Sequence, residues 1–455
     1  MKRDIAMNDY SVASLLARGG FRCVCGKRHE ANLKKAVVKS GAVAELGPVA
    51  RGYGGKRAYV LCDANTFAAA GVPVLRSLGG AGVGYTIFRF PEARTEPDEK
   101  AVGAAVLHFD RTCDIIVGVG SGVINDIGKI LAEMTGLPFV IVATAPSMDG
   151  FASSTSSVVR DGLKVSVDSK CPDAVIADTD ILKEAPPLML QAGLGDMLAK
   201  CVSVCEWRIG HLVTGEYYCP AVAAIIRSAL HKCVKNAEGL MRRDPAAVEA
   251  VMEGLILSGI AADYAGVSRP VSGVEHYFSH LWDMRALEFG TPWSLHGVQC
   301  GIGTVLALKG YERLTELTPD REKALAAFAD MDKAAWYGQI RRYLGNAADA
   351  ILQTADGSAR YDPAQHKKRL ENIVTHWEDI LQIIREELPA SDAAAALLRS
   401  VGAPATSAEI GIPTEENALT FKITKDIRDK YILSTLLFDL GILDEEAERC
   451  FAPQP

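Results

Sequence analysis

The chain has 455 residues, of which 49% are hydrophobic and 23% charged, and its formal net charge is −7. This length exceeds what one ordinary hydrophobic core serves, so we expect two domains. The negative balance argues against a nucleic-acid-binding surface. The most apolar region, residues 114–145, is interrupted by Asp126, Lys129 and Glu133, so we expect no membrane insertion.

Eleven cysteines are scattered along the chain, and the N-terminal apolar run at 12–17 is too short for a signal peptide. Both features indicate a reducing cytoplasm with free thiols. One cluster, Cys23-Val24-Cys25 followed by His29, contains the residue types of a small metal or redox site. A plain turn is the alternative.

Residues 1–50 are expected to form a leader hairpin or strand and then a helix over 29–44, and strands and helices alternate after it. The patterns then predict strands at 56–63, 85–90, 113–119 and 139–143, with helices at 64–78, 96–107 and 124–134. Such alternation predicts a doubly wound, Rossmann-like parallel sheet. After Pro186-Pro187 helical periods continue almost to the end. We therefore expect an α/β domain over 1–185 and an all-helical domain over 186–455.

The turn after the third predicted strand reads Gly118-Val119-Gly120-Ser121-Gly122. Glycines let the backbone approach a pyrophosphate, which the first amides of the next helix would face. The run lacks the last glycine of GxGxxG, and a tight turn without a ligand is the alternative. Asp63, at the end of an earlier strand, is placed either to accept a ribose hydroxyl or to cap the following helix.

The next strand runs into a segment rich in hydroxyl groups, Thr144 to Ser154, which includes Asp149. Parallel sheets bind ligands at this carboxyl edge, so the segment is predicted to line a ligand site. A serine-rich surface loop is the alternative.

Residues 272–299 contain three of the nine histidines. His276 and His280 are four residues apart and share one helical face, and His296 follows a Gly-Thr-Pro break. Two histidines from successive helices, with one carboxylate from elsewhere, make a three-ligand divalent-metal site. Asp196 lies in an apolar stretch where an unpaired carboxylate is costly, and a metal would neutralise it. Capping, or an ion pair with Lys200, is the alternative.

Together these segments resemble the superfamily of iron-containing alcohol dehydrogenases and dehydroquinate synthase, and within it the sn-glycerol-1-phosphate dehydrogenases. The resemblance covers residues 20–310. It lies in GVGSGVINDIGK at 118–129, TAPSMDGFAS at 144–153, GLGDMLAK at 193–200, SRPVSGVEHYFSH at 268–280 and HGVQ at 296–299. It implies a dehydroquinate synthase-like fold.

The resemblance also implies roles for individual residues. Asp196, His276 and His296 would bind zinc or nickel, and iron suits the same ligand set. Asp149 and His280 would be catalytic and contact the substrate, beside Asp196. NAD or NADP would be held by Asp63, on the argument above, and by Gly118, Gly120, Ser121, Gly122, Thr144, Ser147 and Ser153. Ser121 stands where the superfamily has the middle glycine of three, which leaves the phosphate contacts of this turn open.

The implied reaction is the reversible reduction of dihydroxyacetone phosphate to sn-glycerol 1-phosphate, a step of phospholipid metabolism. The metal would polarise the C2 oxygen, and His280 would relay a proton. Candidates for binding the substrate phosphate are Arg160, Lys170 and Arg269. The family suggests a homodimer or larger assembly. The alternatives are a glycerol dehydrogenase for unphosphorylated polyols, a dehydroquinate synthase-like cyclising lyase, and a catalytically inactive NAD-binding protein.

Overall fold

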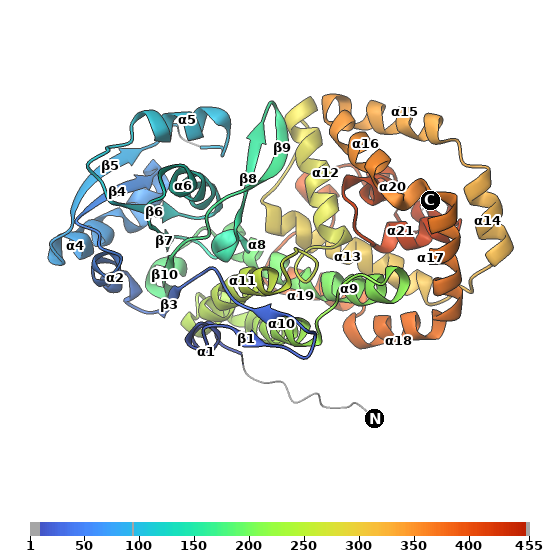
Figure 1. Cartoon of the computed structure of the whole chain (residues 1–455), viewed down its shortest axis with the longest axis horizontal. Coiled ribbons are helices and arrows are strands. Elements are labelled where there is room, and N and C mark those ends of the chain that lie inside the picture. Colours follow the sequence, from blue (N-terminus) through green and yellow to red (C-terminus); the bar gives the residue numbers. More distant parts are fainter. Residues whose placement is uncertain (1–9, 93–94, 452–455) are drawn as a thin grey trace. The chain divides into compact units, whose positions relative to one another are not determined.

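The computed structural model describes residues 10–92 and 95–451. The chain forms two compact units, which interleave along the sequence (Figure 1). The first comprises residues 1–197 and 221–267, and the second comprises residues 198–220 and 268–455. Every strand among the described residues belongs to the first unit.

A six-stranded sheet, parallel throughout, forms the centre of the first unit. Its strand order is β3-β10-β7-β6-β4-β5. The strands are β3 (Lys35–Lys39), β4 (Arg57–Cys62), β5 (Gly84–Arg89), β6 (Ile115–Gly120), β7 (Phe139–Ala143) and β10 (Ala174–Asp178). The predicted doubly wound sheet is confirmed.

The prediction of a helix over 29–44 is wrong, because residues 35–39 form the edge strand β3, which pairs with β10. This five-residue segment, Lys-Ala-Val-Val-Lys, is too short to show helical periodicity. Its paired valines favour a strand when a neighbouring strand is available.

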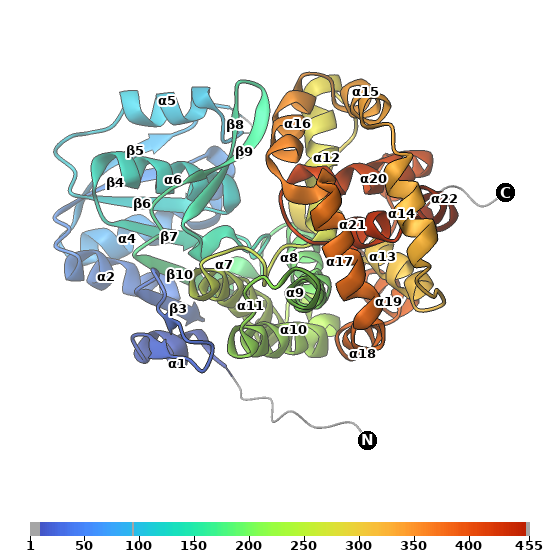
Figure 2. The same cartoon turned by 45° about the vertical axis from the view of Figure 1, so that its right-hand side comes forward.

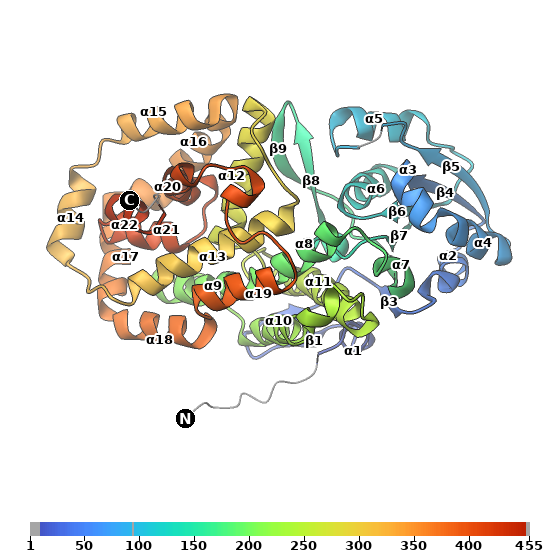
Figure 3. The ribbon, with the colours of Figure 1, turned by 180° about the vertical axis from the view of Figure 1, so that it is seen from behind.

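Helices cover both faces of the sheet (Figures 1 and 3). On one face, Val60, Val117 and Val142 share a hydrophobic core with α2 (Leu46–Gly52) and α4 (Val72–Gly80). On the other face lie α5 (Glu99–Leu107) and α6 (Gly122–Thr135). There the Tyr59 hydroxyl donates to the Ala105 carbonyl over 3.2 Å. Short helices α3 (Ala64–Thr66) and α7 (Thr179–Leu182) follow β4 and β10.

The direction in which strands are added reverses between β4 and β6. β5 lies beyond β4 on one side, whereas β7 and β10 lie beyond β6 on the other. Ligands of open parallel sheets bind outside the carboxyl ends of the strands at such a switch point. Asp63 follows β4 and Ser121 follows β6, so both predicted coenzyme residues lie at this edge.

Further elements complete the first unit. They are an N-terminal helix, two antiparallel hairpins and three longer helices. These elements are α1 (Val12–Ala17), β1 (Phe21–Arg22) with β2 (Arg28–His29), β8 (Thr155–Arg160) with β9 (Leu163–Asp168), α8 (Pro187–Leu198), α10 (Pro220–Leu240) and α11 (Pro245–Ala265).

The second unit contains helices and no strand among its described residues (Figure 2). This confirms the predicted change from alternating strands and helices to helices alone. The helices are α9 (Lys200–Thr214), α12 (Val274–Phe289), α13 (His296–Leu314), α14 (Arg321–Ala329), α15 (Lys333–Leu344), α16 (Ala348–Gly357), α17 (Pro363–Thr375), α18 (Trp377–Glu387), α19 (Ser391–Ser400), α20 (Asn417–Ile427), α21 (Leu433–Asp439) and α22 (Leu443–Phe451).

Two helical runs are long and apolar enough to cross a membrane by length and composition alone: Pro187–Thr214 and Pro245–Ala265. The protein buries 89% and 72% of their most apolar windows, as the core helices of soluble proteins do.

Candidate coenzyme and metal sites

The turn between β6 and α6 leaves the start of the helix uncapped. Ser121 is the cap residue, but its side chain makes no capping hydrogen bond, and the first turn has no acidic residue. The Ser121 hydroxyl instead shares a 2.6 Å hydrogen bond with the Ser147 hydroxyl and donates to the Ala145 carbonyl over 3.3 Å. The N-terminal amides of α6 thus have no side-chain acceptor from this cap, as a phosphate site requires.

The three predicted glycines of this turn are in different surroundings. A Cβ on Gly120 would lie 2.5 Å from the side chain of Ile124, and one on Gly122 would lie 3.3 Å from Met148. Gly118 lies inside β6, where a Cβ would meet Ile141 at 3.0 Å. Packing within the sheet therefore explains Gly118, and its predicted contact with the coenzyme stays a prediction.

Helix α6 holds the loop that follows β7. The side-chain amide of Asn125 donates to the Gly150 carbonyl over 2.9 Å. Lys129, fully buried, donates to the same carbonyl and to the Ser153 hydroxyl, at 3.3 and 3.2 Å. Its ammonium also pairs with Asp126 at 2.8 Å. Lys129 lies in the GVGSGVINDIGK motif, but no role for it could be predicted, because the periodicity of an amphipathic helix does not identify a buried lysine as a loop anchor.

The same loop brings Asp149 against Asp196. The backbone amide of Asp149 donates to Asp196 Oδ2 over 2.9 Å. Asp196 lies on α8 and is fully buried, and a buried carboxylate is costly unless a compensating charge stabilises it. One turn earlier, Gly193 lets α8 approach the loop, since a Cβ there would collide with the Pro146 carbonyl. Thr144 and Ser147, in the preceding part of the loop, are buried.

Asp63 caps α3. Its carboxylate accepts from the Thr66 amide over 2.8 Å, and the Thr66 hydroxyl accepts from the Asp63 amide over 3.0 Å. The structure thus confirms the capping alternative. The second role weighed for Asp63, contact with a ribose, stays a prediction.

In the second unit, α12 and α13 bring His276 and His296 together, with ring centroids 5.1 Å apart. His276 Nδ1 lies 2.9 Å from a carboxylate oxygen of Glu275, which is fully buried. A carboxylate only accepts, so Nδ1 carries the proton and Nε2 presents its lone pair. Carboxylate–histidine pairs of this kind orient metal ligands.

His296 is oriented by a chain of buried polar groups. Its Nδ1 lies 2.9 Å from the Ser279 hydroxyl, which also accepts from the Gln299 amide at 2.9 Å. The same amide donates to Asp283 over 2.8 Å. This chain fixes Gln299 and Ser279, and through them the imidazole ring.

Cys300 joins the two histidines. One ligand atom from each of the three residues lies within 4.8 Å of the others, a spacing that suits a divalent cation. Burial raises the pKa of the Cys300 thiol, but the neighbouring His276 and His296 outweigh burial and lower it. Cys300 was not predicted as a site residue, although its i, i+4 spacing from His296 was a usable signal. His280 is partly exposed, and its ring stacks on His296 with centroids 5.8 Å apart.

The three candidate cations for a substrate phosphate differ in their burial and in their ion pairs. Arg269 is buried and paired with Glu216. Lys170 pairs with Asp173 at 3.0 Å. Arg160, at the end of β8, is exposed.

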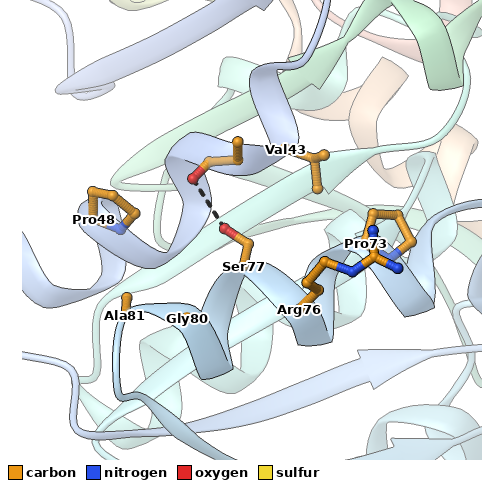
Figure 4. A pocket seen from close by; sticks show the side chains of 8 residues that line it. Val43, Pro48, Pro73, Arg76, Ser77, Gly80 and Ala81 are labelled. Carbon is orange, nitrogen blue, oxygen red and sulfur yellow. Dashed lines mark hydrogen bonds between the residues drawn. The ribbon is translucent and has the colours of Figure 1, made fainter.

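A pocket of about 450 Å³ lies elsewhere, on the helices that cover one face of the sheet (Figure 4). There the Ser77 hydroxyl donates to the Ala44 carbonyl over 3.1 Å. None of the predicted site residues lines it; the lining residues are Val43, Ala44, Pro48, Pro73, Arg76, Ser77, Gly80 and Ala81.

Solved structures define the class of fold. A probable glycerol dehydrogenase from Sinorhizobium meliloti superposes with a TM-score of 0.57 at 19% identity, covering 92% of this chain and 98% of its own. Glycerol dehydrogenase from Schizosaccharomyces pombe gives 0.59 at 18% identity, covering 92% and 90%. The protein thus has the fold of these dehydrogenases, a doubly wound α/β unit with a helical unit.

Sequence comparison narrows the class. The family model described as iron-containing alcohol dehydrogenase matches residues 37–186. Proteins named glycerol-1-phosphate dehydrogenase, with NAD(P)+ in the name, match over more of the chain. The one from Halalkalibacterium halodurans is 35% identical, covering 64% of this chain and 73% of its own. The one from Bacillus velezensis is 30% identical, covering 83% and 84%. The chain belongs to the glycerol-1-phosphate dehydrogenase branch of the iron-containing alcohol dehydrogenase family, and it is an oxidoreductase.

Proposed function

We propose that this protein reversibly reduces dihydroxyacetone phosphate to sn-glycerol 1-phosphate, using NADH or NADPH and a divalent metal ion. The observation that carries the proposal is the pair of buried His276 and half-buried His296, each with its Nδ1 engaged by a neighbouring polar group. The names of the relatives support the phosphorylated substrate.

The coenzyme part of the proposal rests on the sheet edge of the first unit. The amides that begin α6 bind the pyrophosphate, and Thr144 and Ser147 offer hydroxyls on the neighbouring loop. Asp63 accepts a ribose hydroxyl while its other contacts cap α3. Lys129 holds the loop in place through Gly150 and Ser153.

The catalytic part rests on the two histidines together with Asp196, which the sequence motif assigns as the third ligand. A divalent metal held there supplies Lewis-acid stabilisation of negative charge at the substrate's C2 oxygen, and the nicotinamide supplies hydride. Glu275 keeps the imidazole of His276 in the tautomer that presents Nε2, and the Ser279 hydroxyl orients the ring of His296. We assign zinc or nickel to the site, since imidazole and carboxylate ligands suit either, and iron is the third candidate.

His280 has the proton-transfer role in this proposal. It lies one turn after His276 on α12 and stacks on His296 with partial exposure. An imidazole nitrogen of His280 delivers a proton to the C2 oxygen during reduction and removes it in the reverse direction. Asp149, whose amide contacts Asp196, orients the substrate.

The test separates metal ligands from the proton relay. His276→Ala and His296→Ala should each lose bound metal and turnover together. His280→Ala should keep the metal and lose turnover. His376→Ala is the matched control, because His376 is partly exposed and pairs with Asp379 at 3.0 Å. Full activity of His276→Ala, with its metal absent, would refute the assignment of the site.

We further propose that the enzyme is a cytoplasmic homodimer. Light scattering of the purified chain tests the dimer, and a mass equal to one chain would contradict it. Cell fractionation tests the location.

A further inference from the structure

The N-terminal hairpin of the first unit carries two thiols and an imidazole, none of which belongs to the proposed active site. Strands β1 and β2 pair so that Phe21 faces His29. Their turn is closed by the Cys23 amide, which donates to the Lys27 carbonyl over 2.9 Å. Gly26 takes a φ of +87°, which favours glycine at this point of the turn. The turn lies at the surface, since the side chain of Val24 is 98% exposed.

The three side chains have the spacing of metal ligands. One ligand atom from each of Cys23, Cys25 and His29 lies within 4.8 Å of the others. Cys25 Sγ is 3.3 Å from His29 Nε2. Zinc bonds of about 2.3 Å to sulfur and about 2.05 Å to nitrogen, at tetrahedral angles, place these two atoms about 3.6 Å apart.

His29 is already in the tautomer that a metal requires. Its Nδ1 lies 2.7 Å from the backbone carbonyl of Tyr264, the penultimate residue of α11. A carbonyl only accepts, so Nδ1 carries the proton and Nε2 presents a lone pair towards Cys25. The ring is fully buried between Phe21 and Tyr264, with centroids 5.1 and 5.6 Å away.

Cys25 and His29 are in thiol–imidazole contact, and Cys23 offers a second thiol at the same point of the hairpin. Two thiolates and a neutral imidazole form a soft donor set that selects zinc over magnesium or calcium. A helix C-terminus beside the hairpin also favours a cation, and Lys27 lies 3.4 Å from the Ala265 carbonyl at that end of α11.

We propose that Cys23, Cys25 and His29 bind one structural Zn²⁺, which fixes the N-terminal hairpin to the end of α11. Binding releases the two thiol protons to solvent, and the imidazole binds in its neutral form. This proposal uses none of the residues assigned to the active-site metal and does not depend on the proposed function.

The test measures metal in full-length protein that carries His276→Ala and His296→Ala, so that only the hairpin site is counted. We expect about one zinc per chain by mass spectrometry of metals. Adding Cys25→Ser should remove it. Adding Cys450→Ser, at another partly exposed free thiol, should leave it. Unchanged zinc in the Cys25→Ser protein would overturn the proposal.

A second measurement avoids variants that fail to fold. X-ray absorption at the zinc edge, on the protein with Cys23, Cys25 and His29 intact, should show at least two sulfur neighbours and one imidazole. Zinc with only nitrogen and oxygen neighbours would overturn the assignment. A disulfide between Cys23 and Cys25, found by mass spectrometry of non-reduced peptides, would also overturn it.

Discussion

Gly193 offers a sharp test of how α8 shapes the proposed site. A Cβ at this position would collide with the Pro146 carbonyl oxygen and lie 2.9 Å from the Val251 side chain. Real Cβ contacts essentially never fall below 3.0 Å, so in Gly193→Ala the helix and the loop must separate. The loop that moves contains Ser147 and Asp149. Asp196 lies three residues along the same helix.

The magnitude follows from that overlap. Overpacking of a tight interior contact costs about 1–3 kcal/mol of unfolding free energy. A displacement near 1 Å at a reacting group reduces turnover on the order of 100-fold. We therefore expect Gly193→Ala to melt at a lower temperature, to bind NADH more weakly and to lose most of its kcat.

Gly103→Ala is the matched control. Gly103 lies in α5, and a Cβ there meets nothing within 4 Å. Alanine in a helix interior is more favourable than glycine by about 0.5–1 kcal/mol, so this variant should be as stable as the parent or slightly more stable. The measurements are thermal unfolding, NADH fluorescence titration and steady-state rates. If Gly193→Ala matched the parent in all three, the proposed contact between α8 and the loop would be wrong.

Three further predictions concern the second unit. Glu275→Gln removes the charge beside His276 Nδ1 and should weaken metal affinity by about 10–100-fold, measured by competition with a chelator. Burial, and next the charge of Glu275, raise the pKa of Glu206 to about 8. Because the folded protein holds this proton more tightly than the unfolded chain, the protein loses stability as pH rises from the unfolded pKa of the carboxyl group through 8. Glu206→Gln should therefore flatten the fall in melting temperature between pH 5 and 8. His280→Ala should lower kcat by about 10²–10⁴-fold with metal content unchanged.

Each of these has a contradicting result. Equal chelator competition for Glu275→Gln and its parent would show that this charge does not affect the ligand. A Glu206→Gln protein with the parent's pH slope would show that Glu206 does not titrate in this range. Metal loss in His280→Ala would make that residue a ligand instead of a proton relay.

The sheet could be predicted from the sequence where the signal is local. β6 and β7 are continuous apolar runs rich in β-branched residues, and both were predicted nearly to their ends. β3 escaped prediction because its five residues become a strand only through pairing with β10, far along the chain. The interleaving of the two units could not be predicted for the same reason, since α10 and α11 belong to the first unit through contacts that no local pattern encodes.

The candidate sites divide in a similar way. His276 and His296 could be predicted because spacing and breaks in the sequence place them at the starts of two helices. The groups that orient them, Glu275 and Ser279, could not be assigned, because hydrogen-bond partners depend on side-chain directions. Cys23, Cys25 and His29 remained ambiguous in the sequence, and the geometry of the hairpin is what favours a metal.

NADH oxidation by chelator-stripped protein, before and after refilling with zinc or nickel, tests the proposed metal-dependent reduction. Dihydroxyacetone phosphate and unphosphorylated dihydroxyacetone would be compared as substrates. We predict turnover that returns only with metal, strongly favours the phosphate, and yields sn-glycerol 1-phosphate. Preference for dihydroxyacetone would instead indicate a glycerol dehydrogenase, and equal turnover without metal would contradict the proposed role of His276 and His296.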